Sequence, residues 1–301
     1  MVSQSRPYRP VLDHLILDLP LIAIFFVLCG GICFANPETL KVEFLPLAKT
    51  ACAVVSPDQT LIVSVFVGSS EITKTNWITP DQSEELINAG QDKITRLCFF
   101  QNPRPRLGQI NIWKNRFGDN APSELRAISS TKSIDCRFEK WINQVGDKVL
   151  PLGLLSVAFY EAIPPAGTPL IDENGKIVGL ILQPASPNSA YAIPTEAVHR
   201  VLGDILRHRK LVRGWLGISL STESQIPRIT RVWANSPAAR AGIEEQDILL
   251  KAGPYFTDRY PDAVNALFYT IPGEVTAIEI LRDSKRLPFK ITPVIQKPGA
   301  Q

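Results

Sequence analysis

Side chains that could accept a proton near neutral pH are scarce in this chain. Its only three histidines are His14, His199 and His208. Hydrolysis by an activated serine or cysteine needs a nucleophile, a base that removes its proton and a group that orients the base. His14 precedes an apolar segment, and the other two lie on one predicted helix, where we expect them on the solvated face. The sequence therefore offers no histidine to a hydrolytic site of the common kind.

Other nucleophiles lack a diagnostic partner. Cys98 lies in an apolar run, where a thiol stays protonated and unreactive. Ser129 and Ser156 have no evident base, and no Ser–Lys pair has a characteristic spacing. The cysteines form no CxxC pair and no cluster with histidine, so we expect neither a metal site nor a cofactor.

Composition indicates folded domains. Hydrophobic residues make up 45% of the 301 residues, while Pro 25 and Gly 18 predict many turns. The net charge is +3 and no basic stripe is interleaved with aromatic residues, so nucleic acid is not an expected partner. Outside the N-terminal apolar segment the cysteines are Cys52, Cys98 and Cys136. This odd number allows at most one disulfide, with its pairing open.

The N-terminus has the pattern of a targeting segment. Arg6 and Arg9 precede an uncharged run from Leu19 to Ala35, near the short limit of roughly 17 residues for a spanning helix. Asn36-Pro37 then ends any helix. We expect export, by a cleaved signal peptide or a retained membrane anchor, and no other contact with the membrane.

The elements that would position a site are mostly strands. Short runs rich in Val, Ile, Leu and Phe predict strands at Ala51–Val55, Leu61–Val67, Ile94–Phe100, Lys148–Leu152 and Ile177–Leu182. Asp58-Gln59 and Asn174-Gly175 predict hairpin turns between such runs. No long amphipathic helix interrupts residues 40–193, which favours a mainly β fold, a barrel or a sandwich.

A helix separates this β region from a second unit. Val198, Val201 and Leu202 begin its apolar stripe, and Thr195 is predicted as its N-cap. In the second unit, Ser236-Pro237 and Gly242 predict a short capped helix. A helix from Pro261 and a closing strand pair follow, which gives an α+β pattern.

The second unit resembles the PDZ domains of the HtrA/Deg (high-temperature-requirement) family. Asn235–Ile243 and Gln246–Leu249 nearly reproduce that family's "SPAAxAGL…GDxIL" run. The resemblance implies a carboxylate-binding loop formed by Trp215, Leu216, Gly217 and Ile218. A peptide would add to the sheet edge as a strand and place its last side chain near Val264 and Leu267. The alternative for these apolar residues is that they only fill the core.

The first unit resembles the trypsin-like domain that precedes PDZ in that family. Ala51–Val67 is similar to "GSGvvisxdGyilTNxHVV", and Ala162–Leu170 is similar to "AxINPGNSGGPL". Phe66 then stands at the histidine position, Arg96 at the acid position and Ala166 at the serine position. The serine loop is also shorter by about two residues, which removes part of an oxyanion hole. The resemblance therefore implies a protease fold without a working triad. Gln109–Leu150 matches poorly, so we expect a distorted or partly open barrel.

The predicted parts are a signal peptide or anchor at 1–35, a trypsin-like double β-barrel at 36–193, a connecting helix at 194–212, a PDZ domain at 213–296 and a tail at 297–301. We expect an exported protein that binds peptide C-termini and acts as an adaptor or regulator in envelope protein quality control. The family implies a homo-oligomer, as a trimer, or association with an active relative. Two alternatives stay open: an active endopeptidase with a displaced catalytic centre, and a structural envelope protein with a vestigial groove.

Overall fold

The computed structural model describes residues 52–66, 74–78, 83–103, 113–118, 122–129 and 132–295. All of them belong to one compact unit, Asn36–Gln301. The predicted targeting segment and the predicted tail lie outside the described residues. In the ranges given above, no helix combines the length and hydropathy that crossing a bilayer requires.

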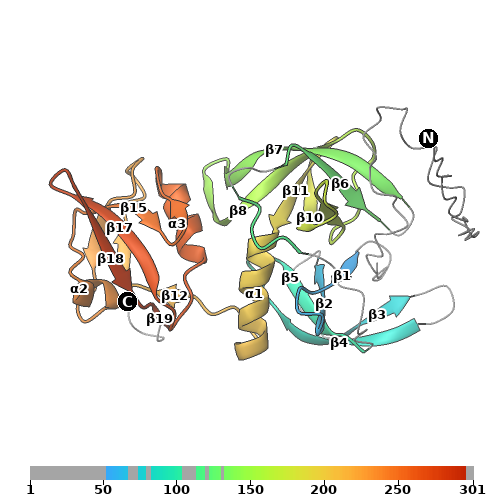
Figure 1. The fold of residues 1–301 in the computed structure, drawn as a ribbon, viewed down its shortest axis with the longest axis horizontal. Coiled ribbons are helices and arrows are strands. Elements are labelled where there is room, and N and C mark those ends of the chain that lie inside the picture. Colours follow the sequence, from blue (N-terminus) through green and yellow to red (C-terminus); the bar gives the residue numbers. More distant parts are fainter. Residues whose placement is uncertain are drawn as a thin grey trace, which may run out of the picture. The chain divides into compact units, whose positions relative to one another are not determined.

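The first sheet contains the predicted histidine and acid positions. Its strands are β1 (Ala53–Val55), β2 (Leu61–Val65), β3 (Lys74–Ile78), β4 (Ser83–Gln91) and β5 (Leu97–Gln101). They are antiparallel in the order β1-β2-β5-β4-β3 (Figure 1). Gln59 has a left-handed φ of 63° in the turn between β1 and β2, so the predicted hairpin is confirmed.

A closed barrel follows. Its strands are β6 (Glu124–Ile128), β7 (Ser133–Val145), β8 (Lys148–Phe159), β9 (Pro169–Ile171), β10 (Ile177–Ser186) and β11 (Ser189–Pro194). They close in the order β10-β11-β8-β7-β6-β9. We expected a distorted or partly open barrel, but this half is closed, because the long β7–β8 pairing supplies strands from the poorly matching region. In the described residues the predicted double barrel therefore consists of one closed barrel and one five-stranded sheet.

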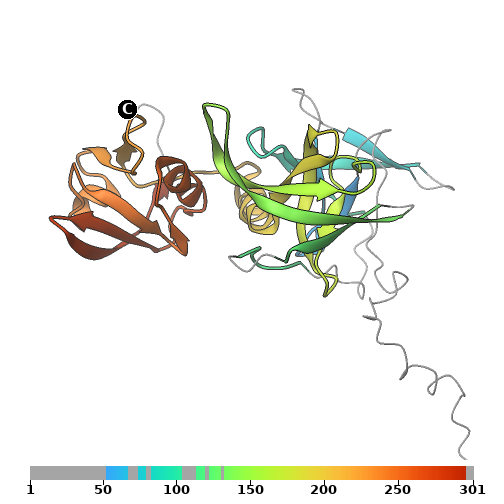
Figure 2. The same ribbon diagram turned by 90° about the horizontal axis from the view of Figure 1, so that it is seen from above.

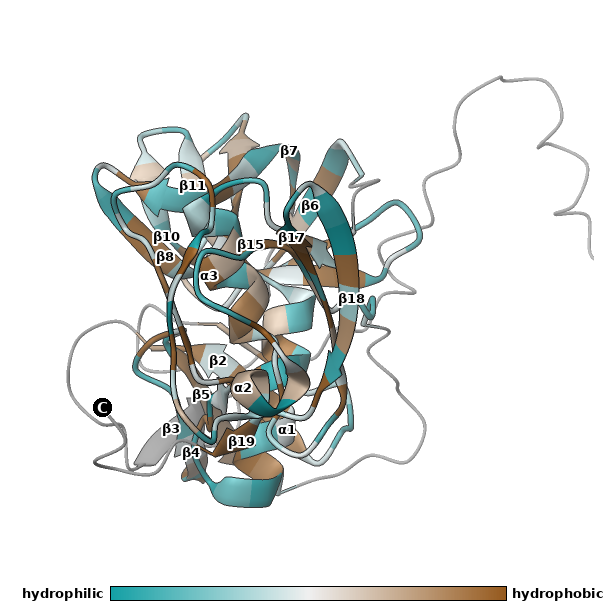
Figure 3. Cartoon of the chain, turned by 90° about the vertical axis from the view of Figure 1, so that its left-hand side faces the viewer, coloured by the Kyte–Doolittle hydropathy of each residue, from teal (hydrophilic) through white to brown (hydrophobic). Residues whose placement is uncertain are grey.

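Helix α1 (Thr195–His208) closes this part of the chain. Its buried side includes Val198, Val201 and Ile205, which share one core cluster with residues of both sheets. Figure 3 shows hydrophobic and hydrophilic residues along the helix. The predicted cap is wrong by one residue: Pro194 is the N-cap, and the Thr195 hydroxyl donates instead to the carbonyl of Lys114 at 2.6 Å.

A buried ion pair fixes the segment after α1. Arg200 Nη1 lies 2.6 Å from Asp204 Oδ2, and both side chains are buried. Asp204 also accepts from the Val212 N–H at 2.7 Å, and Arg200 donates to the Val212 carbonyl at 2.7 Å. Since both charges are paired and hydrogen-bonded, their burial is tolerated and the connection is held against the helix.

The last part is an α+β unit. Its strands are β12 (Gly214–Trp215), β13 (Ile218–Leu220), β14 (Ile229–Val232), β15 (Ile248–Ala252), β16 (Tyr255–Phe256), β17 (Thr276–Arg282), β18 (Lys285–Ile291) and β19 (Val294–Ile295). Its helices are α2 (Pro237–Ala241) and α3 (Tyr260–Phe268). Ser236 caps α2 and Gly242 ends it, as the sequence predicts. The predicted closing strand pair is β17–β18, joined by a two-residue turn in which Asp283 and Ser284 have left-handed φ values of 48° and 62°.

The β7–β8 hairpin contacts α3, and Figure 2 shows the end of the hairpin beside this helix. Asn143 donates to Asp262 at 2.5 Å, and the Asn265 amide reaches the carbonyl of Leu150 at 3.3 Å. Phe268 is buried in the same core cluster as Leu152. The helix therefore packs against the barrel as well as against its own sheet.

Candidate functional site

The predicted serine loop lies against the end of the first sheet. The Cys52 N–H donates to the Ala166 carbonyl at 2.7 Å, and the Ser64 hydroxyl donates to the Cys52 carbonyl at 2.5 Å. Gly167 has a φ of +83°, and a Cβ there would lie 1.9 Å from the Cys52 carbonyl oxygen. Only glycine can make this close approach. The loop is thus brought to the strand that ends next to Phe66.

Phe66 belongs to the apolar core of the first sheet. Only 4% of the residue is exposed, and it packs in a cluster with Ile62, Leu86, Cys98 and Phe100. Its N–H donates to the carbonyl of residue 96 at 3.0 Å. The ring therefore fills a hydrophobic site and offers no group that could take a proton.

Arg96, at the acid position, acts as a bridge between the two β units. Its φ is +60°, and its Nη1 donates to Oε1 of Gln183 on β10 at 2.7 Å. A guanidinium stays protonated and only donates hydrogen bonds. Arg96 therefore cannot orient a base as a carboxylate does.

The loop around Ala166 also lacks the donors of an oxyanion hole. Pro164 and Pro165 carry no backbone N–H. The N–H of Gly167 donates to the Ile181 carbonyl at 2.8 Å, and the N–H of Thr168 donates to the Pro165 carbonyl at 3.2 Å. An oxyanion needs preorganised donors aimed at one point. Of the N–H groups of residues 164–168, only that of Ala166 is left for such a role, and one donor does not make a preorganised pair.

The histidines differ from expectation in one respect. His208 is exposed, as predicted, but His199 is half-buried. Its Nε2 lies 3.3 Å from the Lys114 carbonyl, and its ring meets Trp113 edge-on at 6.3 Å. Burial lowers the pKa of His199. The solvated-face expectation is wrong for His199 because the segment before β6 packs over this side of α1.

The other candidate nucleophiles are Ser156, Ser129 and Cys98, and each is either hydrogen-bonded or held protonated. The Ser156 hydroxyl donates to Glu139 Oε2 at 2.9 Å, a contact that the sequence did not reveal because the two residues meet across β7 and β8. Ser129 donates to the carbonyl of Lys132 at 3.0 Å. Burial raises the pKa of Cys98 to about 12, so its thiol stays protonated.

The three described cysteines, Cys52, Cys98 and Cys136, are free thiols, and each is buried. Across the described ranges, no group of three or more His, Cys, Asp and Glu side chains is arranged to hold a metal ion.

The second candidate site is the loop from Trp215 to Ile218. Gly217 has a φ of +81°, and a Cβ there would lie 2.1 Å from the Cβ of Ser236. The Leu216 carbonyl accepts from the Ala238 N–H at 2.9 Å. The start of α2 therefore supports the back of this loop, and glycine is required at the tightest point.

The front of the loop presents backbone donors. Ile218 and Val232 are direct partners, while the Trp233 N–H donates to the Gly217 carbonyl at 2.9 Å. In an antiparallel ladder this makes 218–232 a non-hydrogen-bonded pair, so the Ile218 N–H points away from β14. Outside the strand ladders of the described residues, the N–H groups of Leu216 and Gly217 make no backbone hydrogen bond. Adjacent donors of this kind can hold a carboxylate.

We predicted that Val264 and Leu267 lie beside this loop and contact the last side chain of a peptide, and the structure brings only Leu267 into an apolar cluster with Ile218. Ile218, Leu220 and Leu267 all pack against the core cluster of this unit and are half-buried. Trp215 and Val264 are also half-buried. The structure thus brings Leu267 and Ile218 to one apolar cluster, with β13 paired on one edge by β14.

Comparisons with known proteins agree with a chain built of a β region followed by an α+β unit. The model of the PDZ domain family matches residues 214–292. The chain is 26% identical over 269 residues to "Serine protease Do-like HtrB" of Bacillus subtilis, covering 76% of this chain and 57% of the relative. It is 24% identical over 249 residues to "Probable periplasmic serine endoprotease DegP-like" of Chlamydia trachomatis, covering 76% and 48%. The chain thus spans about half the length of the curated relatives it matches.

Solved structures share the fold. "HtrA-type protease AlgW with decapeptide" superposes with a TM-score of 0.58 at 17% identity, covering 83% of each chain. "HtrA-type protease AlgWS227A with tripeptide" gives 0.58 at 17% identity and covers 89% of this chain and 98% of that one. At this identity the likeness concerns the fold: a trypsin-like protease domain joined to a PDZ domain.

Proposed function

Since the chain is an HtrA-like protein with a PDZ domain, we propose that it binds peptide C-termini and does not cleave peptide bonds. In this role it is an adaptor or regulatory protein of envelope protein quality control. The observation that supports peptide binding is the loop at Leu216–Ile218, where the Ile218 N–H points away from β14. The loss of cleavage is supported by the burial of Phe66 among apolar side chains.

The proposed binding follows from the geometry of the loop. The N–H groups of Leu216, Gly217 and Ile218 receive the terminal carboxylate, which is a charge-assisted interaction. The peptide backbone then extends along the unpaired edge of β13 as an added strand. Its last side chain is apolar, because Leu267 and Val264 lie on the neighbouring helix.

The proposed location is outside the cytoplasm. The arginines before the uncharged run at 19–35 have the pattern of an export signal. The relative from Chlamydia trachomatis is named a periplasmic endoprotease. A homo-oligomer, with the trimer as first choice, or a complex with an active relative would give the binding domain its regulatory effect.

A peptide titration of the full chain tests the binding half. Fluorescein-labelled peptides with varied C-terminal residues are screened by anisotropy, each beside its C-terminally amidated twin. We expect Kd values on the order of 1 µM to 100 µM for apolar C-termini. Amidation should weaken binding at least tenfold, because it removes the charge that the loop receives. If no peptide binds, the loop is vestigial and the structural alternative holds.

One contact keeps the displaced-centre alternative testable. Ser156 and Glu139 form the serine–carboxylate pair described above, although no histidine adjoins them in the described residues. The full chain is incubated with a fluorophosphonate probe and with casein, beside Ser156→Ala. We expect neither labelling nor cleavage above the background of the variant. Labelling that Ser156→Ala abolishes would establish a displaced hydrolase.

A further inference from the structure

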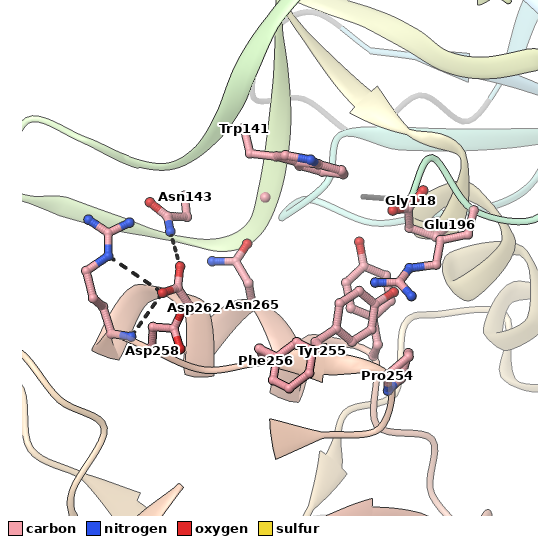
Figure 4. A pocket seen from close by; sticks show the side chains of 14 residues that line it. Gly118, Trp141, Asn143, Glu196, Pro254, Tyr255, Phe256, Asp258, Asp262 and Asn265 are labelled. Atoms are coloured by element: carbon pink, nitrogen blue, oxygen red, sulfur yellow. Dashed lines mark hydrogen bonds and ion pairs between the residues drawn. The ribbon is translucent and has the colours of Figure 1, made fainter. Parts of the chain in front are cut away.

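A cavity of about 500 Å³ lies between the β7–β8 hairpin, the start of α1 and the region of β16 and α3. Figure 4 shows Trp141 on one side and Tyr255, Phe256 and Asn265 across from it. Arg116 and Glu196 also line it. None of the predicted site residues borders this space, so it belongs neither to the serine loop nor to the peptide-binding loop.

Two polar atoms of this cavity lack a partner within the described residues. They are Nε of Arg116, a donor, and Oδ1 of Asn265, an acceptor, and both are buried. The orientation of Asn265 is fixed because its Nδ2 donates to the Pro261 carbonyl at 2.6 Å and to the Leu150 carbonyl at 3.3 Å. A buried donor and a buried acceptor left open are costly, and a ligand that offers the opposite groups would satisfy both.

Charged side chains of both signs line the cavity, including the acidic Asp258. Arg116 lies 4.5 Å over the ring of Tyr255, near the buried carboxyl of Glu196. Burial raises the pKa of Glu196, although the Phe117 N–H donates to it at 3.0 Å. At the other end Arg259 faces Asp262 at 3.6 Å. Because guanidiniums and carboxylates both line the cavity, neither sign of charge dominates it, which favours a neutral molecule over an ion.

The aromatic rings of Trp141 and Tyr255 form walls of the cavity and offer flat surfaces to a ligand. Trp141 is 40% exposed although Phe117 holds it edge-on at 5.6 Å. Tyr255 stacks on Tyr269 at 4.6 Å. Gly153 keeps the space beside Trp141 open, because a Cβ there would lie 3.1 Å from Asn265 Oδ1 and 3.3 Å from Trp141 Cε3. Aromatic faces of this kind stack on planar molecules.

We propose that this cavity binds a small, neutral, planar ring compound that carries one hydrogen-bond acceptor and one donor on its edge. The ring lies on Trp141, the acceptor receives from Arg116 Nε, and the donor gives to Asn265 Oδ1. The site is independent of peptide binding. Asn265 and Leu267 are two residues apart on α3, about 200° around the helix, so they face opposite sides.

Benzamide is the probe, because it combines a ring with an amide acceptor and donor. Its matched control is N,N-dimethylbenzamide, which keeps the ring and the acceptor but has no donor. Saturation-transfer NMR on the full chain should give saturable benzamide binding with a Kd on the order of 1 mM. The dimethyl compound should bind at least fivefold more weakly.

Variants locate the binding. Asn265→Leu, which keeps a good helix former, should weaken benzamide at least tenfold, and Gly153→Ala should weaken it several-fold by crowding the acceptor. Tyr160→Ala, at an exposed aromatic residue outside the cavity, should leave it unchanged. Should Asn265→Leu fail to fold, Gly153→Ala decides. The proposal is overturned if benzamide does not saturate, if both amides bind equally, or if both cavity variants bind like the unchanged chain.

Discussion

The loops at Gly167 and Gly217 both contain a tight glycine turn, but they differ in the acceptors that their backbone N–H groups face. Gly167 and Gly217 have nearly the same left-handed φ, +83° and +81°, and each is pressed against a neighbour that a Cβ would strike. After the prolines of the first loop, the N–H groups of Gly167 and Thr168 bond within the barrel. In the second loop the Ile218 N–H points away from β14. A tight glycine turn thus positions a loop, while the direction of its donors decides whether it can bind an anion.

The largest effect is expected at Gly217. Gly217→Ala places a Cβ 2.1 Å from that of Ser236, so the loop must shift. We expect peptide affinity to fall at least a hundredfold and the free energy of unfolding to fall by about 3 kcal/mol. Anisotropy titration and urea unfolding measure the two effects.

Gly253→Ala is the matched control, because Gly253 has a φ of +58° with nothing within 4 Å of a Cβ. It should cost about 1 kcal/mol in backbone strain and leave peptide affinity unchanged. Equal binding losses in the two variants would mean that general destabilisation, and not the loop, weakens binding.

Restoring the missing side chains should not restore catalysis. The triple variant Phe66→His, Arg96→Asp, Ala166→Ser regains the residue types of a triad. The prolines before residue 166 still deny the oxyanion its donors, and a histidine at 66 would replace a ring that packs in an apolar cluster. We expect no casein cleavage and a loss of about 3 kcal/mol in unfolding free energy, mainly from the histidine.

Ala166→Ser alone is the control for folding of that variant, since it adds one oxygen at a half-buried site. Fluorophosphonate labelling of the triple variant at the introduced serine hydroxyl would show that the loop can still activate a nucleophile. That result would mean that the loop at Ala166, like the loop at Leu216–Ile218, can stabilise an anion.

Acid should weaken the PDZ unit through Asp247. Burial alone would raise the pKa of this carboxyl, but hydrogen bonds from Arg282, at 2.7 Å and 2.8 Å, and from the Glu244 N–H outweigh it and lower the pKa. A lowered folded-state pKa means stability that is present above the ordinary aspartate pKa and lost as pH falls through the folded value. Urea unfolding from pH 7 to pH 2 should show this loss.

Asp247→Asn should remove most of that dependence and cost about 2 kcal/mol at pH 7, because Arg282 loses its charged partner. An unchanged pH profile in the variant would assign the acid sensitivity to other carboxylates.

The smallest effect is expected at Arg96. Arg96→Met removes the hydrogen bond to Gln183 and should lower the free energy of unfolding by about 1 kcal/mol without altering peptide affinity. A double-mutant cycle with Gln183→Leu isolates this contact. A coupling near zero would mean that Arg96 does not bridge the sheets.

Local features were predictable from the sequence, and tertiary ones were not. Turns at Gln59 and Gly175 and the cap at Ser236 depend on neighbours along the chain. The length of the β7–β8 hairpin was missed, because the apolar residues of β7 form no continuous run and only Ile134 and Cys136 among them are fully buried. The half-burial of His199 depends on a segment far along the chain, so helical periodicity could not reveal it.

The candidate sites show the same limit. The positions Phe66, Arg96 and Ala166 can be read from motifs, and none of these three residue types can serve as the base, acid or nucleophile of a Ser-His-Asp triad. The outward direction of the Ile218 N–H follows only from its register with Val232. The cavity beside Asn265 forms where β7, β8 and α3 meet, so no local sequence pattern could predict it.

Amide hydrogen exchange of the full chain, with and without a bound C-terminal peptide, tests the contrast between the two loops most directly. We expect the peptide to slow exchange at Leu216, Gly217, Ile218 and along β13, while residues 164–168 and Phe66 keep their rates. Slowed exchange around Ala166, or unchanged exchange at Leu216–Ile218 under saturating peptide, would contradict this expectation.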